Sequence, residues 1–204
     1  MPSDYIKQGI VVEKGLISEV LVTHLRKYFA MLVENDAPWL FYKDSLFEDG
    51  GVPMVYGDPN FDILMSDVTS TIENIVGKKL NPQYTYARAY PRNSILRRHT
   101  DRISCEHSLS LALGGDKWPI HIKDRDGKTH NVLLDPGDAL VYDGVNLEHW
   151  REPLDGDVCY QVFMHWNDSN GEWKDQIFDG RPNLGLPRSA ASIPVDYKLP
   201  LSFI

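Results

Sequence analysis

The hydrophobic pattern changes its period once along the chain, near residue 82, and this change limits the folds that the sequence can adopt. Before it, the segments 16–34 and 60–77 place apolar residues at helical spacing, so that each segment has one apolar stripe. After it, apolar residues alternate with small or polar ones over 84–90 and 108–113, as they do in half-buried strands. The chain therefore predicts two helices followed by a region that is mainly β.

Turn signals divide the β region into short pieces. Asp126-Gly127 marks a hairpin, and Asp135-Pro136-Gly137-Asp138 suits a type II turn with Pro and Gly at its central positions. Further strands are expected at residues 9–13, 120–123, 130–134, 139–142 and 158–166. Strands this short, at this spacing, are typical of a sandwich or a small barrel.

The same pattern suggests how the chain is organised. We expect one domain over residues 1–204, because this length suits a single core. Within it, residues 1–79 are expected to provide helical support, with Asn60 as the N-cap of the second helix. Residues 80–167 are expected to form the β core, and residues 168–204 an irregular C-terminal tail.

Composition excludes several classes of function. The chain has 29 acidic and 21 basic residues, a formal net charge of −8, and an acidic chain is a poor general binder of nucleic acids. Apolar runs stay well below the ~18 residues of a membrane span, and the N-terminus lacks the pattern of a signal peptide. Cys105 and Cys159 are too few for a disulfide scaffold and are expected to be inert buried thiols. A cytoplasmic protein is therefore expected.

Three residues form a candidate metal centre. His99 and Asp101 stand two positions apart at the end of an expected strand, so their side chains project from the same face. With His149, they would form a facial triad, which holds Fe(II) and leaves adjacent positions open for a co-substrate and O₂. A His-x-Asp triplet alone is common and is more often solvated than bound to a metal. The other histidines have structural interpretations: a helix edge for His24, the exposed hairpin for His121 and His130, the surroundings of the site for His107, and the core or the surroundings of the site for His165.

The order of the motifs around these residues is more specific. Tyr90 and a turn precede His99-Thr100-Asp101, and the Pro-Gly-Asp turn and a strand precede His149. This order, over residues 80–167, resembles the double-stranded β-helix, a jelly-roll or cupin-like barrel, of the Fe(II)/2-oxoglutarate-dependent oxygenases, in particular their prolyl-4-hydroxylase-like branch. The resemblance favours His149 over other histidines as the last ligand. It implies Fe(II), 2-oxoglutarate as co-substrate, O₂ as oxidant and ascorbate as an optional addition.

One usual residue of that family is missing. A Lys or Arg about nine to eleven residues after the second histidine normally pairs with the distal carboxylate of 2-oxoglutarate, whereas residues 158–160 here are Val-Cys-Tyr. Arg151 is the expected replacement. It lies two residues after His149 and faces the same way on a strand, and a guanidinium can bind a carboxylate through two parallel hydrogen bonds.

Arginines gather near the expected metal site although the chain is acidic overall. Five of the ten arginines lie in residues 88–102. Arg88 is the second candidate for the distal carboxylate, and Tyr90, on the same strand face, is expected to donate a hydrogen bond to the same ligand. Lys123 is a third candidate. Arg102 is expected either in this anion site or in a structural ion pair with Glu106.

The resemblance implies a dioxygenase that releases succinate and CO₂ while it hydroxylates an unactivated C–H bond. The substrate would be an amino acid, a peptidyl residue or a small metabolite. Two alternatives remain open. The missing basic residue favours a cupin-like metalloenzyme that does not use 2-oxoglutarate, and a non-catalytic β-barrel binding module would use the three ligands for packing.

Overall fold

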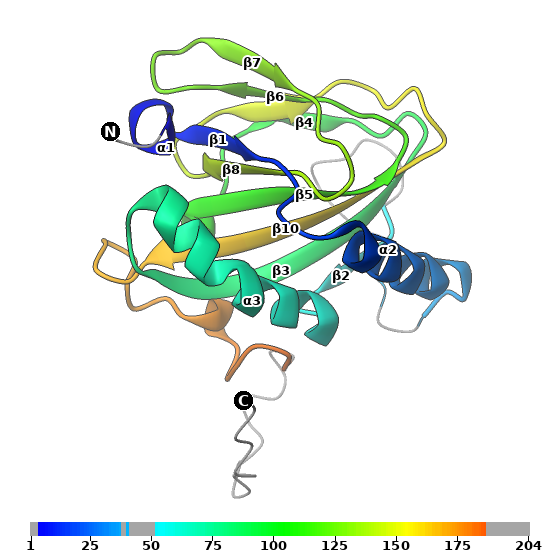
Figure 1. Ribbon diagram of the computed structural model, residues 1–204, viewed down its shortest axis with the longest axis horizontal. Coiled ribbons are helices and arrows are strands. Elements are labelled where there is room, and N and C mark those ends of the chain that lie inside the picture. Colours follow the sequence, from blue (N-terminus) through cyan, green and yellow to red (C-terminus); the bar gives the residue numbers. More distant parts are fainter. Residues whose placement is uncertain (1–3, 38–39, 41–51, 187–204) are drawn as a thin grey trace, which may run out of the picture.

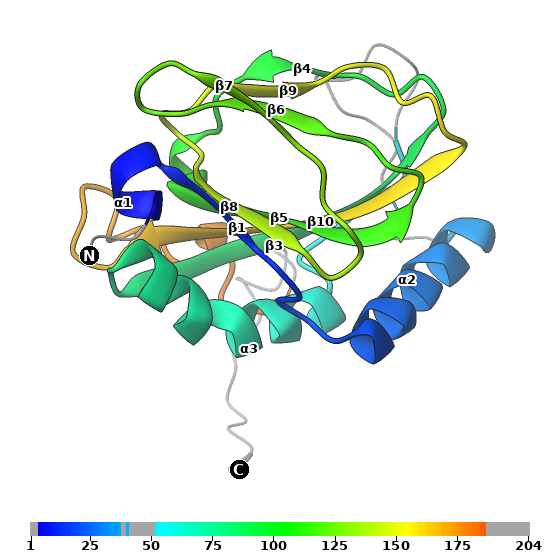
Figure 2. The ribbon, with the colours of Figure 1, turned by 45° about the horizontal axis from the view of Figure 1, so that its top comes forward.

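Two antiparallel sheets face each other, and the two long helices cover the outer face of the larger sheet (Figures 1 and 2). The computed structural model describes residues 4–37, 40 and 52–186. The larger sheet has the strand order β1-β8-β5-β10-β3-β2, and the smaller sheet has the order β4-β9-β6-β7. Their strands are β1 (Ile10–Glu13), β2 (Met54–Tyr56), β3 (Leu80–Pro91), β4 (Leu96–His99), β5 (His107–Gly115), β6 (Ile120–Lys123), β7 (Thr129–Val132), β8 (Ala139–Asp143), β9 (His149–Arg151) and β10 (Val158–Asp168).

The two long helices agree with the predicted segments 16–34 and 60–77 except at their ends. The helices are α1 (Asp4–Gln8), α2 (Glu19–Glu34) and α3 (Pro59–Val76), with the short 3-10 turns η1 (Ile103–Cys105) and η2 (Phe178–Gly180). Ser18 caps α2, so this helix begins later than residue 16. Asn60 is not the N-cap of α3: Asp58 accepts a hydrogen bond from the Asn60 amide at 3.0 Å, and Pro59 occupies the first turn, where its missing amide hydrogen costs nothing.

The prediction of a mainly β fold supported by helices is confirmed, with some additions. The short elements α1 and β2 had no clear pattern in the sequence, and β2 lies inside the segment 36–58 that reads as a loop. Residues 38–39 and 41–51 of that segment, and residues 187–204 of the expected tail, lie outside the described residues.

The two faces of β5 show how the larger sheet contributes to a hydrophobic core on one side and to the space between the sheets on the other. Leu109, Leu111 and Leu113 belong to the hydrophobic core that the sheet shares with α2 and α3. Ser108 and Ser110 project from the opposite face, toward the smaller sheet, because successive side chains of a strand alternate. Small side chains in the middle of this inner face leave space between the sheets.

Asp62 of α3 fastens the chain that follows β10. Its carboxylate accepts a hydrogen bond from Arg181 Nη1 at 2.7 Å and another from the Gly185 amide at 2.7 Å. The Thr85 hydroxyl donates to the other oxygen at 2.7 Å. The side chains of Asp62 and Arg181 are 1% and 0% exposed, so this ion pair lies in the interior.

We predict that Asp62→Ala lowers the free energy of unfolding by about 3–5 kcal/mol, because the change leaves the Arg181 guanidinium buried without its counter-ion. Urea denaturation followed by circular dichroism measures the effect. Asp67→Ala, at an exposed position of the same helix, is the control and should cost about 0.5 kcal/mol or less. Equal effects of the two changes would contradict the structural role of the buried pair.

Candidate metal centre and adjoining cavity

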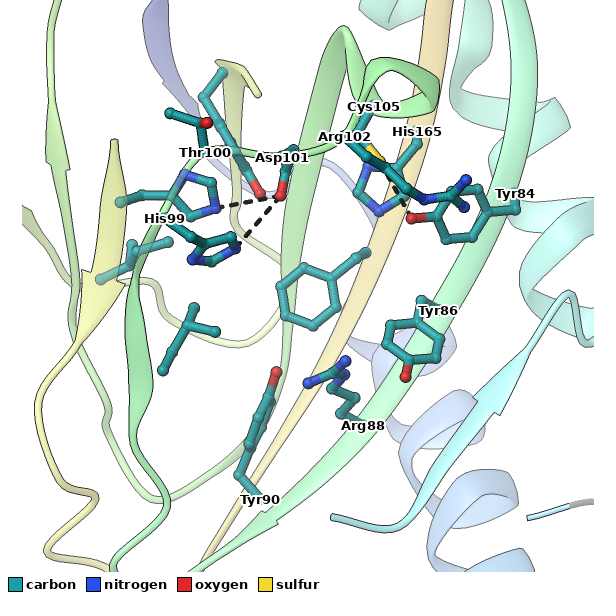
Figure 3. A pocket seen from close by; sticks show the side chains of 15 residues that line it. Tyr84, Tyr86, Arg88, Tyr90, His99, Thr100, Asp101, Arg102, Cys105 and His165 are labelled. Atoms are coloured by element: carbon teal, nitrogen blue, oxygen red, sulfur yellow. Dashed lines mark hydrogen bonds and ion pairs between the residues drawn. The ribbon is translucent and has the colours of Figure 1, made fainter. Parts of the chain in front are cut away.

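The three predicted ligands meet at one point between the sheets. His99 ends β4, His149 begins β9, and the two residues stand opposite each other in the antiparallel pair, with ring centroids 4.3 Å apart. The Nε2 atom of each ring lies 3.5 Å from Oδ1 of Asp101 (Figure 3). Strand pairing therefore brings together two histidines that are far apart in the sequence.

In each histidine ring, the hydrogen bond made by Nδ1 determines whether Nε2 carries a hydrogen or a lone pair. Nδ1 of His99 lies 2.8 Å from the carbonyl oxygen of Arg97, and Nδ1 of His149 lies 2.9 Å from that of Leu147. A carbonyl only accepts, so each Nδ1 carries a hydrogen and each neutral ring presents a lone pair on Nε2. Two such lone pairs and a carboxylate oxygen then face one another. This donor set fits a divalent metal ion.

The pKa of Asp101 shows how strongly the centre favours the carboxylate form. Burial would raise this pKa, but the nearby imidazole rings of His149 and His99 hold it far below its usual range. Burial likewise acts to lower the pKa of His99, yet its contacts with Asp101 and the carbonyl of Arg97 raise it overall. Asp101 is therefore charged, and the surroundings of His99 favour positive charge.

A second layer of contacts holds the Asp101 carboxylate in place. The Ser108 hydroxyl donates to Oδ2 of Asp101 at 2.8 Å and lies 2.9 Å from Nδ1 of His165. The backbone also fits closely, because a Cβ added at Gly144 would lie 2.6 Å from Oδ2 of Asp101. His165 thus belongs to the surroundings of the site, one of the two interpretations that the sequence left open.

A cavity of about 350 Å³ adjoins the centre. Its wall on the larger sheet carries Tyr84, Tyr86, Arg88 and Tyr90 of β3, and Phe163 of β10 (Figure 3). Other lining residues include Leu96, Thr100, Arg102, Cys105, Ile120 and Tyr142. The cavity therefore joins a polar metal centre to a largely aromatic wall that contains guanidinium groups.

Arg151 lies in the interior behind this cavity and does not line it. Its side chain is among the largest fully buried ones, and it donates to the carbonyl oxygen of Trp118. The Ser110 hydroxyl and the Gln161 amide oxygen accept from Nη2 at 3.4 and 3.5 Å. Nε has no hydrogen-bond partner, and none of the described carboxylates pairs with the guanidinium. A buried cation bonded only to neutral oxygens is costly unless an anion joins it.

Tyr90 lies between the two arginines that were singled out. Burial raises the pKa of its phenol to about 12, while the nearby Arg88 and Arg151 act in the opposite direction. The phenol points toward the cavity (Figure 3). Lys123, the third candidate, instead forms an ion pair with Glu148 at 2.8 Å on a partly exposed surface and does not line the cavity.

The expected structural pair of Arg102 with Glu106 is wrong. Arg102 donates to both carboxylate oxygens of Asp179, at 2.7 and 2.8 Å, because η2 brings this residue beside the cavity mouth. Glu106 accepts a hydrogen bond from the amide of Asp168 instead. The short separation in sequence suggested Glu106 as the partner of Arg102. The partner in the structure is Asp179, which lies far away along the chain.

Two of the remaining histidines are less exposed than a hairpin position suggests. His121 stacks on Trp150 with ring centroids 5.3 Å apart, and His130 lies 2.7 Å from a carboxylate oxygen of Asp124. His107 is buried, and its Nδ1 lies 2.6 Å from the Tyr5 hydroxyl. None of the three lines the cavity.

The sequence did not reveal the closeness of Cys105 to the centre. Its thiol is buried and lies 3.1 Å from the Tyr84 hydroxyl. Burial raises the pKa of this thiol well above its usual value, in keeping with the expected inert form. Candidate ligand atoms of Asp101, Cys105 and His165 lie within 4.8 Å of one another, so a second group of potential ligands shares the aspartate of the first.

No family model matches the chain, and no curated protein matches its sequence. Solved structures do match. A Pseudomonas putida prolyl-4-hydroxylase superposes with a TM-score of 0.65 at 19% identity, over 81% of this chain and 95% of that one. SnoK, a non-haem α-ketoglutarate-dependent carbocyclase of nogalamycin biosynthesis, gives 0.68 at 14% identity, over 81% of each chain. HygX from Streptomyces hygroscopicus, solved with nickel and 2-oxoglutarate, gives 0.62 at 14% identity, over 81% and 85%.

The chain has the fold of the Fe(II)/2-oxoglutarate-dependent oxygenases. The predicted jelly-roll architecture is thereby confirmed. No helix in the described part of the chain is both long enough and apolar enough to cross a membrane.

We predict that Ser108→Ala weakens divalent metal binding by about 10- to 100-fold, because Asp101 loses the hydroxyl that orients its carboxylate. Titration with Co(II), followed by visible absorption, measures the affinity. Ser110→Ala is the matched control, since Ser110 projects from the same face of β5 but contacts Arg151 and Gln161. An unchanged affinity in Ser108→Ala would show that Asp101 needs no such support.

Proposed function

We propose that the protein is an Fe(II)- and 2-oxoglutarate-dependent dioxygenase that hydroxylates an unactivated C–H bond of a small molecule. The observation that carries the proposal is the pairing of two features inside a fold of this kind. Three acceptor atoms of His99, Asp101 and His149 converge beside a cavity, and the buried guanidinium of Arg151 has no carboxylate partner among the described residues. The first feature suits Fe(II), and the second suits a dianionic co-substrate.

The protein's own residues have distinct tasks in this proposal. His99, Asp101 and His149 hold the metal on one side and leave the side toward the cavity open. Fe(II), 2-oxoglutarate and O₂ would together supply an oxidative decarboxylation of 2-oxoglutarate, with succinate and CO₂ as its products and an oxidant able to attack a C–H bond. Tyr90 donates a hydrogen bond to the co-substrate, and the aromatic wall excludes water from the reacting groups.

Arg151 is the proposed partner of the distal carboxylate. The family resemblance places a basic residue near position 159 on β10, and this chain has the small Cys159 there. Gln161 links Cys159 and Arg151: its amide nitrogen donates to Cys159 Sγ at 3.2 Å, and its amide oxygen accepts from Arg151 Nη2 at 3.5 Å. Arg151 on β9 is therefore the basic side chain nearest in kind to the missing one on β10 in this proposal.

The neighbours support this class without fixing the reaction. They include a prolyl-4-hydroxylase, an epimerase and a carbocyclase, which carry out different reactions on one fold. Hydroxylation of a small molecule is the reaction that we propose among these. We also propose a cytoplasmic location and an optional use of ascorbate.

The alternative is a cupin-like metalloenzyme that does not use 2-oxoglutarate, and Cys159 is the observation that favours it. In that case Arg151 would be a structural residue that bridges the sheets through Trp118 and Ser110. A non-catalytic binding module would in addition bind no metal. The three hypotheses thus differ in which ligands the protein binds.

Anaerobic titration separates them. We predict that Fe(II) together with 2-oxoglutarate produces a weak visible charge-transfer band near ~500 nm, as expected for a chelate at an open facial site. Arg151→Met should raise the concentration of 2-oxoglutarate needed for half of the band by at least about tenfold, because a charge-assisted pair is lost, and should leave Fe(II) binding intact. Lys123→Met is the control and should change neither.

Each of the other possible results of this titration favours a different hypothesis. Fe(II) binding without the band would favour the cupin-like enzyme, and failure to bind Fe(II) would favour the binding module. A normal band in Arg151→Met would remove this arginine from the co-substrate site while leaving the reaction class in place.

A further inference from the structure

A second group of candidate metal ligands lies beside the triad and shares its aspartate. We propose that Asp101, Cys105 and His165 form an inhibitory site for thiophilic divalent metals such as Zn(II) and Cd(II), and that a metal bound there excludes Fe(II) from the triad. This inference goes beyond the proposed function and rests on it in one respect, since it takes the triad as the iron site.

The three side chains are close enough to share one ion. Their candidate ligand atoms lie within 4.8 Å of one another, and all three residues line the cavity, which gives an ion access to them. The ligand atoms of a tetrahedral Zn(II) lie about 2.0–2.3 Å from the metal and so about 3.5 Å from one another. Small rotations of the Cys105 and His165 side chains would therefore bring the group to that geometry.

The fold holds Cys105 and His165 in defined positions. Cys105 ends the turn η1, and its amide donates to the carbonyl oxygen of Arg102 at 2.9 Å. His165 lies within β10 and is paired there with Ser108 of β5. The Ser108 hydroxyl connects the group, because it lies 2.8 Å from Oδ2 of Asp101 and 2.9 Å from Nδ1 of His165. The ligands are thus gathered before any metal binds.

The two groups of ligands approach the Asp101 carboxylate from different sides. Nε2 of each triad histidine lies 3.5 Å from Oδ1, whereas Oδ2 accepts from the Ser108 hydroxyl that also contacts His165. Figure 3 shows His99 on one side of this carboxylate and Cys105 with His165 on the other. One carboxylate therefore serves two neighbouring positions. Dications in both positions would repel each other strongly, so we expect only one of them to be filled at a time.

The donor atoms give the two positions different metal preferences. The triad offers two imidazole nitrogens and a carboxylate oxygen, whereas the second group has the Cys105 thiol in place of one imidazole. Thiolate ligands favour Zn(II) and the softer Cd(II) over Fe(II). A coordinated thiol is deprotonated outright, so its proton passes to solvent as the metal–sulfur bond forms. A thiol that burial makes a poor nucleophile can therefore still bind a metal.

Tyr84 supplies a group that would stabilise the metal-bound sulfur. Its hydroxyl lies 3.1 Å from Cys105 Sγ, and its ring lies beside that of His165, with centroids 4.5 Å apart. A phenol can donate its hydrogen to a thiolate, and hydrogen bonds to coordinating groups raise metal affinity. Tyr84 therefore covers the second position from β3 and favours the charged form of the thiol.

Titration of the metal-free chain with Cd(II) tests the site. A cadmium–thiolate bond absorbs in the ultraviolet, so this charge-transfer band reports sulfur ligation. We expect the band to be complete at about one equivalent of Cd(II), without 2-oxoglutarate or O₂. Cys105→Ala should abolish the band, and His165→Gln should raise the Cd(II) concentration for half of it at least about tenfold, because one ligand is lost.

Cys159→Ala is the matched control, because Cys159 is the other cysteine of the chain and is also buried. This variant should keep the full band. With two cysteines in the chain, a band that survives in Cys159→Ala assigns the sulfur to Cys105 even if Cys105→Ala does not fold. Circular dichroism of each variant checks its folding.

Mn(II) measures the exclusion. It prefers nitrogen and oxygen ligands, so it is expected at the triad, and its electron paramagnetic resonance signal distinguishes free from bound ions. Addition of Cd(II) to the Mn(II)-loaded chain should release Mn(II) in step with the growth of the ultraviolet band. A band that forms while Mn(II) stays bound would contradict the exclusion.

Other results would overturn the site itself. A missing band in the unaltered protein would do so without any variant, and so would a full band in Cys105→Ala. Unchanged Cd(II) affinity in folded His165→Gln would contradict the proposed ligand set. These results would leave the proposed function standing. Failure of Fe(II) and 2-oxoglutarate to give their visible band would instead contradict that function and leave the Cd(II) result in place.

Discussion

The convergence of three hydrogen-bond acceptors is the constraint on which the site depends. Backbone carbonyls fix a hydrogen on Nδ1 of both His99 and His149, so that their inner nitrogens can only accept while they are neutral. The carboxylate of Asp101 faces the same point. Acceptors that face one another repel unless a proton or a metal ion lies between them, and the fold supplies the strand pairing that holds them there.

The two faces of strand β5 in the larger sheet have different roles. The leucines of β5 pack against the helices, and its serines face inward, where bulkier residues would fill the space between the sheets. Ser108 donates to the candidate metal ligand Asp101, and Ser110 contacts the buried Arg151. The small inward residues of this strand therefore contact both parts of the proposed site, and alternation along the strand places its leucines in the outer core.

The sequence was informative where a feature depends on local periodicity or on strand pairing between recognisable motifs. Helical and alternating periods predicted α2, α3 and most strands, and the His-x-Asp spacing together with the turn before His149 predicted the triad. Features that depend on long-range contacts were missed. Asp179 is far from Arg102 in the chain, and the closeness of Cys105 to Asp101 follows from the short turn η1. The cap of α3 was placed wrongly because both Asp58 and Asn60 are good capping residues and only the geometry distinguishes them.

A basic side chain that would bind the same anion can come from different strands of this fold. A long side chain on β10 and one on β9 can reach the same region between the sheets, because these strands lie on opposite walls of one interior. With Cys159 on β10, the space is open to Arg151 from β9, whose guanidinium is bonded there to neutral oxygens alone among the described residues. A cation in such surroundings is stabilised most by an anion that enters with it.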